Sequence, residues 1–171
     1  NHLLNIGKKK DKFMKKRIIL NILVAVMLIC ALAPAAAADE AVLNRHIADG
    51  TCGEGLSWSL DGYTLTISGS GAMTDYSAQA SAPWSAYAGE IQEIVVKQGV
   101  TRIGSNAFAG CSALAGIEIP VAVTSIGNGA FNNCNRLAHV FYRGTEAQKN
   151  AISIENYNTS ITDAEWIFET A

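Results

Sequence analysis

The chain has 171 residues, enough for one domain of ordinary size; 49% of them are hydrophobic and 16% are charged. Seven of its 13 lysine and arginine residues lie within residues 1–38, which contain one acidic residue, Asp11. The rest of the chain therefore carries six basic and 14 acidic side chains, a net charge of −8. A surface of that sign repels phosphate backbones, so nucleic acid is not an expected partner.

Residues 14–38 have the pattern of a secretory signal peptide. Three basic residues follow Met14, an apolar run covers residues 18–32, and an alanine cluster ends at Ala38. The apolar run is short for a bilayer span, which takes about 20 residues. We therefore expect cleavage near Ala38, with membrane contact only through this leader before it is removed. Residues 1–13 precede Met14 and are interpreted as an upstream artefact.

Residues 39–50 show no periodicity and are predicted to be a flexible lead-in. Residues 51–90 are interpreted as an N-terminal hairpin followed by a degenerate first repeat. Apolar and polar residues alternate over residues 56–60 and again over residues 64–68, as they do in half-buried strands. Asp61 followed by Gly62 is a turn signal between the two runs. Together these features predict a β-hairpin.

Residues 91–144 contain a repeat with a period of 23 residues. The segment 100–108 recurs as the segment 123–131, and Cys111 recurs as Cys134. Each repeat also contains two apolar residues that alternate as in a strand. These pairs are Ile94 and Val96, Ile117 and Ile119, and Val140 and Tyr142.

One such repeat cannot bury its apolar face alone, whereas stacked repeats bury a continuous core. The repeats therefore predict a solenoid with the recurring apolar residues inside. Phe108 and Phe131 are large enough to fill its interior. Trp84 lies about one period before Phe108 and is expected to fill the core at the preceding level.

Residues 145–171 are interpreted as a C-terminal cap. Thr145 and Gln148 fit a capping box and predict a short helix to about Ile152. Residues 156–162 are polar and are predicted to form a loop. Residues 165–169 are predicted to form a last strand or an apolar lid. The expected fold class is mostly β: a short solenoid with an N-terminal hairpin cap and a small C-terminal cap of helix and strand.

The repeats resemble a known family. The runs T-R-I-G-S-N-A-F-A-G-C-S-A-L at 101–114 and T-S-I-G-N-G-A-F at 124–131 are similar to BspA-type leucine-rich-repeat proteins of bacterial surfaces. Residues 51–76 and 141–152 resemble the regions that open and close such proteins. The resemblance implies a right-handed α/β-type leucine-rich-repeat solenoid, secreted or at the cell surface, with adhesion or host-protein binding. Lys149 departs from the resemblance, which places tryptophan there.

The sequence contains none of the common catalytic motifs, such as H-E-x-x-H, G-x-S-x-G, a P-loop or C-x-x-C. His139 is expected to be solvated, and His46 falls in the predicted lead-in. Stacked strands lie about 4.8 Å apart, whereas a disulfide prefers Cβ atoms about 3.8 Å apart. Cys111 and Cys134 are therefore predicted to be buried and reduced, while the state of Cys52 stays open. No catalytic residue, cofactor or metal is expected.

The outward strand positions of successive repeats are expected to align into one face, which is the candidate partner-binding surface. Exposed apolar residues beside mixed charges are typical of interaction patches, although an ordinary solvated face explains them equally well. The site residues are Glu93, Val95, Lys97, Glu118, His139, Phe141 and Arg143, with Gly116 and Pro120 completing the face.

A protein of the extracellular matrix, of a host or of a bacterial surface is the expected partner. Two alternatives are kept. A carbohydrate-binding or enzyme accessory domain would need an enclosed cleft near Asp75, Tyr76 and Trp84. A structural repeat fragment would have no ligand of its own.

Overall fold

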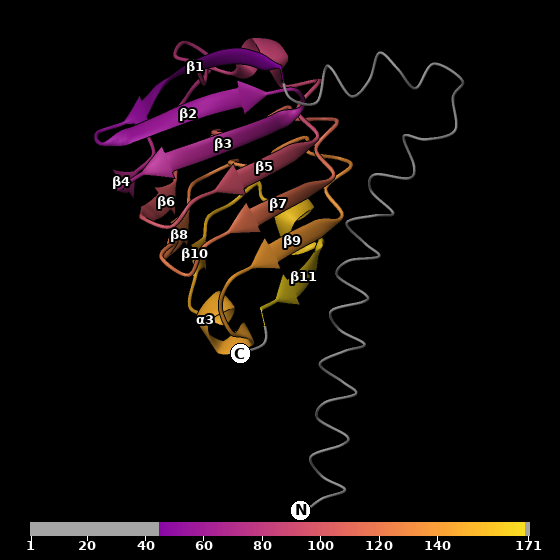
Figure 1. Cartoon of the computed structure of the whole chain (residues 1–171). Coiled ribbons are helices and arrows are strands. Elements are labelled where there is room, and N and C mark those ends of the chain that lie inside the picture. Colours follow the sequence, from indigo (N-terminus) through magenta and orange to yellow (C-terminus); the bar gives the residue numbers. More distant parts are fainter. Residues whose placement is uncertain (1–44, 170–171) are drawn as a thin grey trace, which may run out of the picture. The chain divides into compact units, whose positions relative to one another are not determined.

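The computed structural model describes residues 45–169, which form two β-sheets and three short helices (Figure 1). The predicted leader over 14–38 and the upstream residues 1–13 lie outside the described residues. In spatial order, the seven-stranded sheet consists of β1 (His46–Gly53), β2 (Leu56–Asp61), β3 (Thr64–Gly69), β5 (Glu93–Val96), β7 (Gly116–Ile119), β9 (His139–Tyr142) and β11 (Glu165–Phe168).

The four-stranded sheet contains β10 (Ser153–Ile154), β8 (Ser125–Ile126), β6 (Val100–Ile103) and β4 (Gly71–Ala72), in that spatial order. The helices are η1 (Ser85–Tyr87), a single 3₁₀ turn, with α3 (Glu146–Asn150) and α4 (Thr159–Thr162).

The predicted hairpin is confirmed: β2 and β3 pair antiparallel, with Leu60 opposite Leu65. The predicted flexible lead-in is wrong for its second half, because β1 begins at His46 and pairs antiparallel with β2. Its register shifts between His46 and Ala48 and again between Thr51 and Gly53. These irregularities interrupt the period-two alternation by which a strand is recognised in a sequence.

From β3 onwards, neighbouring strands are parallel in both sheets, and the chain visits the two sheets alternately. Ile94 pairs with Ile117, and Ile117 with Val140, so the 23-residue period is the register of the sheet. The next partner in this row, Trp166, comes 26 residues after Val140, and α3 and α4 lie in between. Figure 1 shows the strands as successive rungs from β1 to β11.

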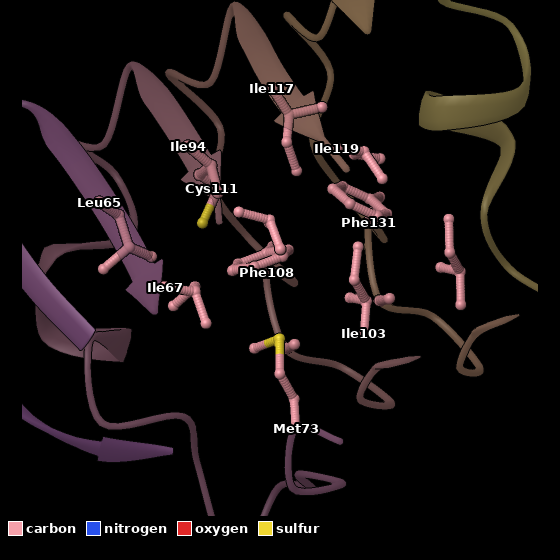
Figure 2. Close-up of a cluster of buried hydrophobic side chains, with 14 of the residues drawn as sticks. Leu65, Ile67, Met73, Ile94, Ile103, Phe108, Cys111, Ile117, Ile119 and Phe131 are labelled. Carbon is pink, nitrogen blue, oxygen red and sulfur yellow. The ribbon is translucent and has the colours of Figure 1, made fainter. Parts of the chain in front are cut away.

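The core lies between the two sheets. Figure 2 shows Leu65, Ile94 and Ile117 on neighbouring strands, with Phe108 and Phe131 packed beside them. The predicted role of Trp84 is confirmed: it is 1% exposed, and its ring centroid lies 5.8 Å from that of Phe108. The rings of Phe108 and Phe131 follow at 5.4 Å. A column of three aromatic rings therefore runs through the stacked repeats.

Each repeat needs a left-handed backbone at two positions. Asn106 has φ of 53° and its equivalent one repeat later, Gly129, has 61°. Gly110 has φ of 79° and its equivalent, Asn133, has 61°. Glycine and asparagine adopt this conformation at the lowest steric cost. The recurring Asn and Gly around each phenylalanine are therefore dictated by the turn.

Side chains complete the backbone ladder at both ends of the aromatic column. Between the repeats, the Phe108 amide donates to the Ala130 carbonyl at 2.8 Å. At one end the Trp84 Nε1 donates to the Ala107 carbonyl at 2.8 Å. At the other end the Phe131 amide donates to the Asn158 Oδ1 at 3.0 Å. The Trp84 and Asn158 side chains therefore take the places that backbone groups of a further repeat would occupy in the hydrogen-bond ladder.

The polar segment 156–162 is therefore more than the predicted loop. Asn158 is 3% exposed, Ile161 is fully buried, and α4 occupies the end of the segment. The Asn158 Nδ2 donates to the carbonyls of Gly127 and Glu155, both at 2.9 Å. Asn158, Thr159 and Ser160 match the pattern Asn-x-Ser/Thr of N-glycosylation sites. The buried Asn158 side chain is inaccessible to that modification in the folded chain.

The capping box at α3 is confirmed by reciprocal hydrogen bonds between Thr145 and Gln148, although the helix ends at Asn150. The last strand is also confirmed as β11. Lys149, the departure from the family resemblance, places its Nζ 5.2 Å from the centroid of the Trp166 ring. A cation–π contact therefore joins α3 to β11.

Cys52, Cys111 and Cys134 are buried free thiols. Cys111 and Cys134 are buried and unpaired, as predicted, and the Cys134 Sγ donates to the Phe108 carbonyl at 3.1 Å. Burial raises the pKa of Cys111 and of Cys134 to about 12, and that of Cys52 to about 11. The thiolate, which is the reactive form, is therefore scarce near neutral pH.

We expect replacement of Asn158 by Ala to lower the free energy of unfolding by about 2–3 kcal/mol, because it leaves the buried Phe131 amide and the Gly127 carbonyl without partners. Urea unfolding of the full chain measures the effect. Asn156→Ala is the control, since the Asn156 side chain is exposed and only its carbonyl is used. Equal stability of the two variants would contradict the role assigned to Asn158.

We expect the three thiols to be unreactive in the native chain at pH 8 and to react once guanidinium unfolds it, because burial disfavours their thiolates. A colorimetric thiol assay under non-reducing conditions, on the chain from residue 39 onwards and therefore without Cys30, measures both states. Recovery of only one of these three thiols after unfolding would show that a disulfide joins the other two.

Candidate functional site

The outward residues of the seven-stranded sheet lie in rows, because the strands are in register. We call this surface the sheet face. One row contains Glu93, Gly116, His139 and Glu165, and the next contains Val95, Glu118, Phe141 and Ile167. Lys97, Arg143 and Glu169 follow the ends of their strands.

Five of the seven predicted site residues, Glu93, Val95, Glu118, His139 and Phe141, occupy these paired positions, and Lys97 and Arg143 directly follow β5 and β9. Three expectations for the face need correction. Val95 and Phe141 are half-buried and not exposed. His139 is also half-buried, beside Glu165. Pro120 is buried, because β7 ends at Ile119 and the chain turns there towards the second sheet.

Arg143 links three strands across the face. Its Nε donates to the Glu118 Oε1 at 2.6 Å, and its Nη1 lies 3.5 Å from the Glu169 Oε2. The hydrogen bond and charge of Glu118 raise the pKa of Arg143. The guanidinium is therefore held against β7 and β11.

His139 and Phe141 are neighbours on β9. The His139 Nδ1 lies 3.4 Å from the Glu165 Oε2, and its ring centroid is 6.4 Å from that of Phe141. An ideal Cβ placed on Gly116 would meet the Phe141 Cε2 at 3.6 Å. The Phe141 ring thus lies against the one position of its neighbouring row that has no side chain.

The sheet face extends beyond the predicted residues. Glu165, Ile167 and Glu169 belong to it, although the sequence predicts only their strand and not its register. At the other end, the ring nitrogens of His46 lie 2.9 and 3.1 Å from carboxylate oxygens of Asp49 and Asp61, to which a protonated imidazole donates. Those carboxylates raise the pKa of His46.

Most charges on this face are compensated within it. Among residues 45–169, every acidic or basic side chain of the face except Glu93 and Lys97 has a side chain of the opposite type beside it. The contacts of His46 and His139 with carboxylates are ion pairs only while the imidazole is protonated. The full set is His46, Asp49, Asp61, Glu93, Lys97, Glu118, His139, Arg143, Glu165 and Glu169. The pKa of Glu93 is raised, mainly by desolvation and to a lesser extent by the charge of Glu118.

The alternative site near Asp75, Tyr76 and Trp84 is a hollow of about 240 Å³. Asp75 does not line it; its Oδ1 instead accepts from the Ser105 amide at 2.7 Å and from Arg102 at 2.6 Å. These two contacts lower the pKa of Asp75. Tyr76 and Trp84 do line the hollow, but they direct their polar groups to the carbonyls of Cys52 and Ala107.

Tyr76 is the single ionisable residue that lines the hollow, and burial raises its pKa to about 12. The remaining lining side chains are serine, alanine, asparagine and tryptophan. The hollow therefore offers neutral hydrogen-bonding groups but no proton donor or acceptor suited to acid–base chemistry near neutral pH. In residues 45–169 no three His, Cys, Asp or Glu side chains converge as a metal site. None of the helices described there is long and apolar enough to cross a bilayer.

Comparison with known proteins gives one family and one related structure. Residues 85–164 match the family described as BspA type leucine rich repeat region (6 copies). A leucine-rich repeat protein from Eubacterium ventriosum ATCC 27560, known from its crystal structure, is similar, with a TM-score of 0.46 and 29% sequence identity. The similarity covers 58% of this chain and 32% of the other, so the chain spans about a third of that protein. No curated protein matches.

We expect Glu118→Gln to lower the pKa of Glu93, because it removes the nearby like charge and leaves the desolvation unchanged. The ¹³C shift of the Glu93 carboxyl carbon, followed against pH, measures it. A raised folded pKa means that the stability contributed by protonated Glu93 is present below the unfolded pKa and lost as pH rises through the folded pKa.

Glu93→Gln should therefore raise the free energy of unfolding slightly at pH 7, where Glu93 is ionised, and raise it less at low pH, where Glu93 is already protonated. An unshifted Glu93 pKa, or one that Glu118→Gln leaves unchanged, would contradict the like-charge effect of Glu118.

Proposed function

We propose, from the premise that residues 85–164 form a BspA-type leucine-rich-repeat region, that the chain is an exported protein-binding module without catalytic activity. Its partner contacts the sheet face. The observation that carries this proposal is the alignment of Glu93, Val95, Glu118 and Phe141 in registered rows on neighbouring strands.

The sheet face suits a protein partner more than a small molecule. Half-buried Val95, Phe141 and Ile167 share a row with Glu118, so apolar surface alternates with charge. Non-obligate protein interfaces have this mixed character, with an apolar centre and a polar rim. Small-molecule sites are concave pockets instead.

Rigidity supports the same proposal. We infer that the repeats form a short right-handed solenoid, with β1–β3 and the α3–β11 segment shielding its two ends. Strands fixed by parallel ladders on both sides lose little further entropy when a partner binds. Stacked repeats also present extended surfaces that larger protein partners can follow.

The place of action follows from the sequence of the leader and from the charge. Residues 14–38 have the pattern of an export signal, and the remainder carries a net charge of −8. We propose secretion or display at the cell surface, with a protein of the extracellular matrix, a host or a bacterial surface as the partner in an adhesin-like role.

A carbohydrate ligand is the second candidate, and one observation favours it: the neutral hollow beside Tyr76 and Trp84 is lined by several serine hydroxyls. Its aromatic residues are 9% and 1% exposed, however, so they offer little ring surface for stacking on a sugar. The protein-binding proposal is therefore the stronger of the two.

We expect the double variant Phe141→Thr, Arg143→Gln to weaken partner binding by about tenfold or more, since an aromatic and an arginine are the usual anchors of an interface. Interferometry against extracellular-matrix and plasma proteins at physiological salt measures binding. The control is Arg136→Gln with Tyr157→Asn, both exposed and off the face. Circular dichroism is the check that both double variants are folded.

Equal affinity of the two double variants for a bound partner would refute the sheet face as the binding surface. Binding of glycans alone, unaffected by Phe141 and Arg143, would move the function to the hollow.

A further inference from the structure

The charges of the sheet face leave Glu93 without a counter-ion. Arg143 is engaged by Glu118 and Glu169, and His139 lies beside Glu165. Lys97 leaves the same strand four residues later, about 13 Å along it at the usual rise, and forms no ion pair with Glu93. Among residues 45–169, Glu93 is therefore the one carboxylate of the sheet face that has no basic side chain beside it.

Glu93 pairs with Thr64 on one side of its row and with Gly116 on the other, and Gly116 has no side chain to cover the carboxylate. The row beyond Gly116 continues with His139, two strands away from Glu93. Adjacent strands lie about 4.8 Å apart, so about 10 Å separates the strands of Glu93 and His139. No side chain of this row stands between them.

An aromatic ring borders this place. The Phe141 Cε2 lies 3.6 Å from where a Cβ on Gly116 would be, so the ring borders the space above the glycine. Val95, two residues after Glu93 on the same strand face, is half-buried and forms an aliphatic border. A group above Gly116 would thus meet a carboxylate, an aromatic ring and a methyl surface.

That combination selects a cation with an apolar stem. A carboxylate forms its strongest hydrogen bonds with guanidinium or ammonium groups. An aromatic ring attracts the same cations through its quadrupole. The methylene stems of arginine and lysine pack on apolar surface while the charged head stays at its partner. The raised pKa of Glu93 agrees with this, because an uncompensated and partly desolvated carboxylate gains most from a counter-ion.

We propose that the position above Gly116, between Glu93 and the Phe141 ring, receives an arginine or lysine side chain of the protein partner. This assignment rests on the proposed function of the sheet face and names the chemistry of the partner at its centre. Arginine fits better than lysine, since its planar head can stack on Phe141 while it bonds to Glu93.

Titration of the isotopically labelled full chain with N-acetyl-arginine amide tests the proposal without the natural partner. We expect saturable NMR shifts at the Gly116 amide and the Phe141 ring. N-acetyl-citrulline amide has nearly the same shape but no charge, and it should shift neither. Glu93→Gln should weaken arginine binding by about tenfold, the effect of losing one charge-assisted contact. Glu90→Gln, three residues earlier and exposed, should leave it unchanged.

Equal responses to the two probes, or arginine binding that survives Glu93→Gln, overturns the assignment. This outcome is separate from failure of the proposed function. A chain that binds no protein through its sheet face can still bind the arginine probe at Glu93. A chain whose partner binding depends on Phe141 and Arg143, but not on Glu93, keeps the function and loses the cation site.

Discussion

The stacking of peptide groups beside the phenylalanines is the constraint on which the rest of the structure depends. Each repeat places an alanine–phenylalanine pair against the next, so that the Phe108 amide meets the Ala130 carbonyl while the rings stack in the core. Burial of the rings requires burial of this backbone, and buried peptide groups must find partners. Backbone hydrogen bonds and ring packing at the same alanine–phenylalanine pair therefore hold neighbouring repeats together.

This constraint explains what lies at the two ends. A stack of repeats always leaves unpaired peptide groups on its first and last members. Trp84 donates from its indole where a preceding amide would stand, and Asn158 accepts through its amide oxygen where a following carbonyl would stand. Both residues are almost fully buried, so neither peptide group is left to water. The sheet face makes no contact of its own in this arrangement. It depends on it because the stacking of the repeats also places their outward residues in rows.

The sequence predicts those features that depend on local order. Alternation and a turn signal locate the hairpin, the 23-residue period gives the register of β5, β7 and β9, and the capping box gives the start of α3. It does not reveal β1, because two register shifts in that strand disturb the alternation. It also misses Asn158, since the partners of that side chain lie in another repeat and a polar segment by itself has the composition of a loop.

The candidate site divides in the same way. The outward positions follow from the period, so the repeat alone places Glu93, Glu118 and Phe141 on one face. Which charges cancel depends on side-chain rotamers and on the register of β11, and neither is encoded locally. Arg143 could have paired with any of several acids; the fold engages it with Glu118 and Glu169 and thereby leaves Glu93 alone.

The end residues have a consequence for how the length of such a chain can change. The hydrogen bonds of Trp84 and Asn158 to the adjacent repeat go to backbone groups that every repeat has. Neither reads the identity or the number of the repeats between them. Duplication of a 23-residue unit within the stack would therefore add one strand to each of the two sheets and leave both ends intact. The sheet face can thus grow by gene duplication while the same two residues still close its ends.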